Sequence, residues 1–261
     1  MHTPIVFIPG FIGHLSFPEL TDGMPDGLAF RPDLLGYGVK RDAPVAGITI
    51  EDQSAHLRSE IHKFCEDRPV VLFAHSGGAA IAMHYAASHP ERVAALVSAE
   101  GHLASSDGYL SSKLAVMPLA ALSHWVTQIR EDPASLLGGQ RSRLKSNQLA
   151  RVISWLDHQP ASTILAAARA LLFYTARPGY GDEVASVMAR LPTYLISGQS
   201  TLAGMDVSAR FARFARATFT VEGAGHAMVL ESPEIVGAQL RDILSLVEKV
   251  DNGQTRARVQ P

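Results

Sequence analysis

The sequence predicts an α/β fold: a doubly wound, mostly parallel sheet of about six strands, with a helical cap inserted between two of them. Short apolar runs predict the strands, at residues 4–8, 28–30, 69–73, 93–98, 192–197 and 217–221. Helical patterns lie between these runs, and this alternation is typical of a parallel sheet with helices on both faces. About 90 residues separate the fourth run from the fifth, which is far more than one crossover helix requires. We therefore expect the insertion there.

Capping residues and apolar periodicity predict the helices. Thr49 can cap a helix in which apolar residues such as Leu57 and Ile61 recur at helical spacing, and Ser232-Pro233 can open another. Amphipathic patterns within the insertion predict helices over about 109–130, 141–157 and 160–175. The expected division of the chain is an α/β core over 1–100 and 191–250, a helical cap over 101–190 and a flexible polar tail over 251–261.

The composition is that of a globular chain with little net charge. Of its 261 residues, 47% are hydrophobic and 18% are charged, and the formal net charge is −2. Such a chain offers no electrostatic footprint for nucleic acid or for an anionic membrane. No basic leader and no apolar run of about 18 residues is visible, which predicts a cytoplasmic protein without a membrane span. The single Cys65 cannot form an internal disulfide and is expected in the core.

The segment Ala74-His75-Ser76-Gly77-Gly78 lies between the apolar run 69–73 and an alanine-rich stretch, which predicts a strand, a tight turn and a helix. Small residues are needed around the serine because the backbone must reverse sharply enough to push its side chain outward. An exposed serine at a helix N-terminus is a candidate nucleophile; the alternative is a serine in an ordinary turn. His226, in a glycine-rich loop after the last predicted strand, can supply the base.

These residues, with two further segments, resemble the α/β-hydrolase family. Ala74-His75-Ser76-Gly77-Gly78 is similar to the family's nucleophile elbow, G-x-S-x-G, with Ala74 in place of the first glycine. Pro9-Gly10-Phe11-Ile12-Gly13 resembles its oxyanion loop, and the segment 32–38 resembles its P-D-x-x-G-x-G turn. The order of Ser76 and His226 along the chain also matches the family.

The family's usual acid position is vacant in this chain. Most members place an aspartate in a Gly-x-x-Asp turn after the strand that follows the cap, where this chain has Thr201. Threonine cannot stabilise the imidazolium that forms when histidine takes the serine proton. Glu100 matches the position used by a subset of the family, including some haloalkane dehalogenases and some lactone hydrolases. Asp206 is the alternative acid, and its other interpretation is a helix N-cap; we favour Glu100.

The resemblance implies hydrolysis through an acyl-enzyme. Ser76 would be the nucleophile, His226 the base, and Glu100 the carboxylate that orients His226. The backbone N–H groups of Phe11 and Gly77 would hold the oxyanion.

Other residues are expected near the site without a direct chemical role. His75 would help to hold the turn, and His14 and His102 would border the pocket. Most aromatic residues of the cap would pack it against the sheet, and one or two would line the pocket, from Trp125, Trp155, Phe173, Tyr174 and Tyr180.

The simplest function is that of a carboxylesterase or lactonase acting on a small, largely apolar molecule. A carbon–carbon bond hydrolase, thioesterase, amidase or cofactor-free perhydrolase would use the same three residues, and a ligand-binding receptor on this scaffold is the alternative from another class. Serine at the elbow argues against dehalogenase and epoxide-hydrolase chemistry, because those relatives carry an aspartate there. No metal-ligand spacing and no G-x-G-x-x-G after a strand is present, so we expect no metal and no cofactor. The expected partner is a small-molecule substrate.

Overall fold

The structure, a computed structural model, describes residues 2–137, 145–202 and 211–251. In these residues six strands form one parallel sheet in the order β2-β1-β3-β4-β5-β6. The strands are β1 (Ile5–Ile8), β2 (Ala29–Phe30), β3 (Val70–His75), β4 (Val93–Ala99), β5 (Thr193–Gly198) and β6 (Ala217–Val221). β1, β3 and β5 are buried along their whole length, whereas the outer strands β2 and β6 are partly exposed. The inner strands are apolar because both of their faces are covered.

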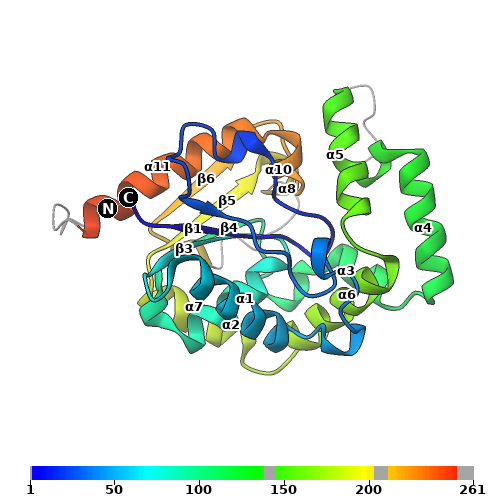
Figure 1. The fold of residues 1–261 in the computed structure, drawn as a ribbon, viewed down its shortest axis with the longest axis horizontal. Coiled ribbons are helices and arrows are strands. Elements are labelled where there is room, and N and C mark those ends of the chain that lie inside the picture. Colours follow the sequence, from blue (N-terminus) through cyan, green and yellow to red (C-terminus); the bar gives the residue numbers. More distant parts are fainter. Residues whose placement is uncertain (1, 138–144, 203–210, 252–261) are drawn as a thin grey trace.

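Helices cover both faces of the sheet (Figure 1). α1 (Ile50–Cys65), α2 (Gly78–Ser88) and α7 (Tyr180–Arg190) lie on one side, and α11 (Pro233–Asp251) lies on the other. Between β4 and β5 the chain also forms α3 (Tyr109–Ala115), α4 (Leu119–Glu131), α5 (Ser146–Asp157) and α6 (Ala161–Thr175). Figure 1 shows α4 and α5 side by side, beyond the end of the sheet. Two short helices, α8 (Gln199–Leu202) and α10 (Met228–Glu231), follow β5 and β6.

The parallel six-stranded sheet confirms the predicted fold class. Thr49 caps α1 as expected, since its side-chain oxygen accepts the N–H of Asp52 at 3.0 Å. The single helix predicted over 109–130 is wrong: α3 and α4 are separate and Pro118 lies between them. Proline disfavours helical backbone in the residue before it and cannot donate a helix hydrogen bond. Of the predicted tail, only Asp251 lies within the described residues, as the last residue of α11.

The insertion does not form one layer. α6 packs against α3 and α4, whereas α7 packs against α2 on the face of the sheet. α7 is an additional helix that the apolar patterns of the insertion do not predict. None of the helices in the described ranges is both long and apolar enough to cross a membrane.

Gly237 lets α11 approach the 3-10 turn Pro18–Leu20 closely. A Cβ at this position would lie 2.3 Å from the carbonyl oxygen of Glu19 and 3.2 Å from the Cα of Leu20. Backbone atoms cannot rotate away as a flexible side chain does, so α11 would have to shift. The contact therefore fixes how the last helix is seated on the sheet.

We expect Gly237→Ala to lower the free energy of unfolding by about 1–3 kcal/mol through this overpacking, although alanine favours a helix by about 1 kcal/mol over glycine. Urea denaturation measures the change. Gly47→Ala is the matched control, because no atom lies within 4 Å of a Cβ built there. Equal stability of the two variants would contradict the tight-contact argument.

Candidate active site

Ser76 stands at the apex of the turn from β3 to α2. Its φ angle is 53°, in the left-handed region that L-residues seldom adopt. The N–H of Ser76 donates to the carbonyl oxygen of Ala99 at 2.9 Å, which ties the turn to the end of β4. A left-handed residue at this point turns its side chain out of the strand direction. The serine is 5% exposed, so the expectation of an exposed side chain is wrong: the loop after β1 and the neighbouring side chains cover it.

The small residues of the turn are explained by contact with the end of β1. A Cβ on Gly78 would lie 2.3 Å from the carbonyl oxygen of Pro9, and a Cβ on Gly10 would lie 3.1 Å from the Cβ of Ser76. Any larger side chain at Gly78 would push α2 away from the sheet. The turn and the loop after β1 are therefore packed backbone to backbone.

Ser76, His226 and Glu100 form a continuous line of side chains. Nε2 of His226 lies 2.9 Å from Oγ of Ser76, and Nδ1 of His226 lies 3.4 Å from Oε2 of Glu100. The side chain of His226 is 45% exposed, whereas that of Glu100 is 6% exposed. An Nδ1–H facing the carboxylate leaves Nε2 free to accept the hydroxyl proton of Ser76. The three residues come from the ends of β3 and β4 and from the loop after β6.

Both the backbone and the side chain of Glu100 are held by hydrogen bonds. Its φ angle of 51° is, like that of Ser76, in the left-handed region. Its N–H donates to the carbonyl oxygen of Ile196 at 2.9 Å, and its Oε1 accepts the N–H of Gly198 at 2.6 Å. A buried carboxylate is costly unless it is paired in this way. The other oxygen therefore remains directed at His226.

The two other acid positions considered from the sequence have different outcomes. Thr201 lies in α8, directly after β5, and Gly198 at the end of that strand donates to Glu100. Asp206 lies outside the described residues. In the described part of the chain, Glu100 is the carboxylate that faces the ring of His226.

Two neighbouring histidines are neutral supports of the site. Burial, and next the charge of His226, lower the pKa of His75 to about 3 and that of His102 to about 3. Because neutral His75 faces a carbonyl, its Nε2–H donates to the backbone oxygen of His226 at 2.9 Å. The backbone N–H of His102 donates to the carbonyl oxygen of Ser76 at 3.1 Å. The carbonyl oxygen of His102 accepts a hydrogen bond from the hydroxyl of Tyr180 at 2.6 Å.

The loop after β1 faces the first turn of α2. A Cβ built on Gly77 would lie 3.7 Å from the backbone nitrogen of Phe11, so the two residues face each other across a narrow gap. Within the described ranges, neither the N–H of Phe11 nor that of Gly77 donates to a protein acceptor. Two free donors beside Ser76 form the arrangement expected of an oxyanion hole.

Trp155 in α5 and Gln159 just after α5 bond the loop that follows β1. The indole N–H of Trp155 donates to the carbonyl oxygen of His14 at 2.7 Å, and Oε1 of Gln159 accepts the N–H of Gly13 at 2.9 Å. Gly13 has a φ of 93°, and a Cβ there would overlap the Trp155 ring. The hydroxyl of Tyr37 donates to the carbonyl oxygen of Phe11 at 3.0 Å from the other side. Three loop residues are thus bonded or packed by side chains distant in sequence.

His14 belongs to this support. Its Nδ1 accepts the N–H of Ser16, and its Nε2 lies 3.1 Å from Oγ of Ser154. Burial, and next the charge of His158, lower the pKa of His14 to about 4, so the ring is neutral near pH 7. Both ring nitrogens are therefore occupied by hydrogen bonds within the protein.

Glu231 supports the loop that carries His226. Its Oε2 accepts the N–H of Gly225 at 3.1 Å. Burial raises its pKa, and the bond to Gly225 opposes this rise. Sequence reasoning missed Glu231, Tyr37 and Gln159. Only Glu231 offered a signal, as a lone charged residue after an apolar run, and that signal does not identify the backbone group that its side chain bonds.

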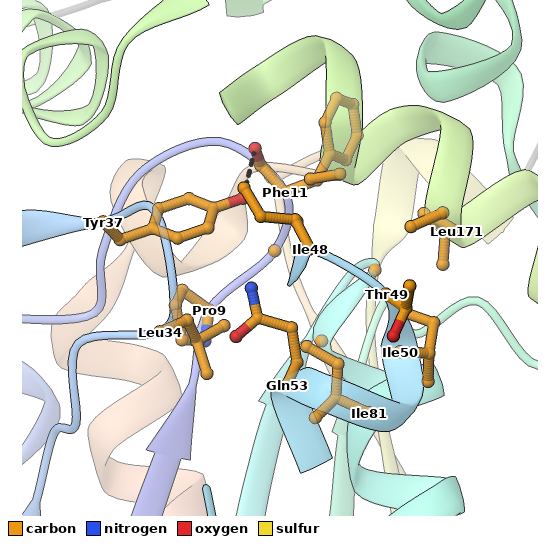
Figure 2. A pocket seen from close by; sticks show the side chains of 15 residues that line it. Pro9, Phe11, Leu34, Tyr37, Ile48, Thr49, Ile50, Gln53, Ile81 and Leu171 are labelled. Atoms are coloured by element: carbon orange, nitrogen blue, oxygen red, sulfur yellow. Dashed lines mark hydrogen bonds between the residues drawn. The ribbon is translucent and has the colours of Figure 1, made fainter. Parts of the chain in front are cut away.

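A pocket lies beside the oxyanion loop and is lined by residues of that loop and of α1, α2 and α6 (Figure 2). The aromatic residues that line it are Phe11 and Tyr37. The insertion aromatics have other places: Trp155 packs on the oxyanion loop, Phe173 is exposed, and Tyr174 and Tyr180 are buried. Among the described residues, no group of three or more His, Cys, Asp or Glu side chains is arranged to hold a metal ion.

Known proteins are similar to this chain in sequence or in fold. Lipase LipV of Mycobacterium tuberculosis is 41% identical over 79 residues, which are 30% of this chain and 29% of that protein. The match thus spans less than a third of the lipase. A thermophilic esterase from Thermogutta terrifontis is 18% identical, with a TM-score of 0.65 over 94% of this chain and 90% of the esterase.

A third relative carries a different activity in its name. A haloalkane dehalogenase loop variant from Bradyrhizobium elkanii is 18% identical, with a TM-score of 0.71 over 96% of this chain and 91% of the other. At such identities the two solved structures establish a shared fold. The sequence model described as the Alpha/beta hydrolase family matches residues 5–239. With the elbow, the parallel sheet and this match together, the chain belongs to the α/β-hydrolase family.

Proposed function

We propose that the protein is a serine hydrolase that cleaves carboxylic esters or lactones of small, largely apolar molecules through an acyl-enzyme. The observation that carries this proposal is the line from Ser76 through His226 to Glu100, at 2.9 Å and 3.4 Å. The names of the lipase LipV and of the Thermogutta esterase agree with ester hydrolysis. We also propose that residues 101–190 act as the cap of a core made of 1–100 and 191–250.

The proposed reaction has two steps. The Oγ of Ser76 bonds to the carbonyl carbon while its proton passes to Nε2 of His226, and the leaving oxygen then takes that proton as its bond to carbon breaks. Water, deprotonated by His226, then attacks the carbonyl carbon of the acyl-enzyme. The bond from that carbon to Oγ of Ser76 breaks, His226 returns the proton to Oγ, and the acid is released. Glu100 stabilises the imidazolium in both steps. The N–H groups of Phe11 and Gly77 would hold the negative carbonyl oxygen, and each such donor is typically worth about 100- to 1,000-fold in turnover.

The support from α5 has a defined place in this mechanism. Donors stabilise an oxyanion strongly only when they are already in position, because they then need no reorganisation during the reaction. Tyr37 bonds the carbonyl of Phe11 itself. Gln159 and Trp155 bond Gly13 and His14, further along the same loop. We propose that they are positioning residues, which act on the reaction through the oxyanion loop.

A fluorophosphonate probe tests the nucleophile. We expect it to label Ser76, and we expect Ser76→Ala to lose both labelling and the hydrolysis of short-chain p-nitrophenyl esters. Mass spectrometry of the labelled peptide locates the adduct. Absence of labelling, together with no hydrolysis of esters or lactones, would contradict the enzyme proposal and favour a binding protein.

Glu100→Gln tests the acid. The amide cannot stabilise the imidazolium and favours the wrong tautomer of His226, so we expect kcat to fall by about four orders of magnitude. Asp206→Asn should leave kcat nearly unchanged. Steady-state kinetics with one p-nitrophenyl ester decides between them, and the reverse order of the two variants would disprove the assignment of Glu100.

Trp155→Phe tests the positioning of the oxyanion loop. It removes the N–H that bonds His14 but keeps an aromatic ring against Gly13. Loss of one neutral hydrogen bond of about 1 kcal/mol predicts a fall in kcat of about 5- to 10-fold. KM should change little, and a trifluoromethyl ketone, which mimics the tetrahedral state, should bind more weakly. Trp125→Phe, in α4, is the matched control; an equal effect of both variants, or a change in KM alone, would argue against positioning.

A further inference from the structure

The ring of His102 lies beside the reactive residues and is buried without a hydrogen-bond partner. Its backbone N–H donates to the carbonyl oxygen of Ser76, and its ring centroid lies 6.4 Å from that of His226. The residue is 4% exposed. Within the described ranges, no protein group bonds either of its ring nitrogens. A buried polar group with no partner in the protein calls for an explanation, and its position favours a ligand.

A comparison with other histidines shows that the His102 ring is available to a ligand. Nε2 of His75 donates to the backbone oxygen of His226, and both ring nitrogens of His14 are bonded. Among the described side-chain atoms that are fully buried and lack a partner, one belongs to His89 and none to His102. The ring nitrogens of His102 therefore border the accessible space at the site, where a bound molecule can reach them.

We infer that His102 binds the leaving-alcohol part of the ester, through a hydrogen bond to an oxygen that lies two carbons from the ester oxygen. The site then prefers alcohols that carry a 2-hydroxy or 2-alkoxy group to hydrocarbon alcohols of equal length. The inference rests on the proposed function, whose substrate class it makes narrower.

The strand order places His102 on the leaving-group side of Ser76. The strand that leads to Ser76, β3, lies between β1 and β4. The loop after β1 carries Phe11, a proposed oxyanion donor, whereas the loop after β4 carries Glu100 and His102. The two loops therefore flank Ser76 from opposite sides. His226 faces Glu100, so its Nε2, which protonates the leaving oxygen, lies on the side of His102.

The distance between the rings of His102 and His226 fits a substrate with two neighbouring oxygens. A hydrogen bond spans about 3 Å between its heavy atoms. Two oxygens that each bond one of two rings 6.4 Å apart must therefore lie close together. The oxygens of an O–C–C–O unit meet this condition: the ester oxygen would bond Nε2 of His226, and the second oxygen would bond His102.

His102 can supply a hydrogen bond but cannot replace the base. Burial, and next the charge of His226, lower the pKa of His102 to about 3, so its ring is uncharged and a weak base near pH 7. A neutral imidazole has one N–H donor and one acceptor nitrogen, which suit an ether or a hydroxyl oxygen. An uncharged ring also avoids repulsion with the imidazolium that His226 forms. A hydrocarbon alcohol would leave both nitrogens of His102 unpaired, which is unfavourable.

Two esters of the same acid test the contact. Butyl butyrate and 2-methoxyethyl butyrate differ by one oxygen in place of a methylene, and both form the same butyryl-enzyme. His102→Phe and His102→Leu remove the ring nitrogens, whereas His102→Gln keeps an amide that can bond the oxygen. His124→Phe is the matched control, because His124 is exposed on α4. p-Nitrophenyl acetate and p-nitrophenyl butyrate, which share their alcohol, report on the acyl side.

The measured quantity is the ratio of kcat/KM for the methoxyethyl ester to kcat/KM for the butyl ester. The intrinsic reactivity of the two esters is the same for every variant, so a change in this ratio isolates the contact. We expect His102→Phe and His102→Leu to lower the ratio by about 5- to 10-fold, the value of one neutral hydrogen bond, and His102→Gln to lower it less. His124→Phe should keep the wild-type ratio, and the acetate-to-butyrate ratio should be the same in every variant. Poor folding lowers the hydrolysis of both esters equally and cannot change the ratio.

The outcomes separate this inference from the proposed function. If the wild type hydrolyses no ester and the fluorophosphonate does not label Ser76, the proposed function is wrong and the inference falls with it. If esters are hydrolysed and Ser76 is labelled, but His102→Phe and His102→Leu keep the wild-type ratio, only the inference is overturned. An equal loss with all esters would then show a structural role for the ring. A change in the acetate-to-butyrate ratio would place His102 on the acyl side and would also overturn the inference.

Discussion

The close contact between the β3–α2 turn and the end of β1 is the constraint on which the rest of the site depends. Gly78 leaves room for the carbonyl oxygen of Pro9, and Gly10 leaves room for Ser76. These contacts let α2 begin directly against the sheet, with Ser76 in a left-handed conformation. Strain of that kind persists only where surrounding structure holds it. Here the hydrogen bond from Ser76 to Ala99 and the backbone packing on β1 provide the restraint.

A second constraint is the burial of a carboxylate at the end of β4. Glu100 is nearly buried, yet one oxygen bonds the end of β5 and the other faces His226. The carboxylate therefore links the ends of β4 and β5 to the loop after β6, which carries His226. Glu231 holds that same loop through Gly225. Two carboxylates on separate elements thus fix a histidine whose ring remains 45% exposed and accessible to a substrate.

Much of this could be predicted from the sequence because the information was local. The apolar runs at 4–8 and 69–73 predicted buried strands, and the small residues around Ser76 predicted the sharp turn. The pairing of Glu100 with His226 was a hypothesis drawn from the family pattern, since their separation along the chain carries no geometric information. The hydrogen bonds of Tyr37, Gln159 and Glu231 could not be predicted, because each joins a side chain to a backbone group that only the folded topology brings near. The break at Pro118 was visible, but a continuous apolar pattern across it favoured one helix.

The oxyanion loop and the pocket beside it are parts of one packed unit. Tyr37 lines the pocket and bonds the carbonyl of Phe11, whose N–H is the proposed donor. Leu171 lines the same pocket and lies against Gly77, since a Cβ there would be 2.9 Å from its Cδ2. Close-packed interiors transmit small displacements. A substitution that fills or empties this pocket would therefore displace both walls that carry the proposed donors and lower turnover.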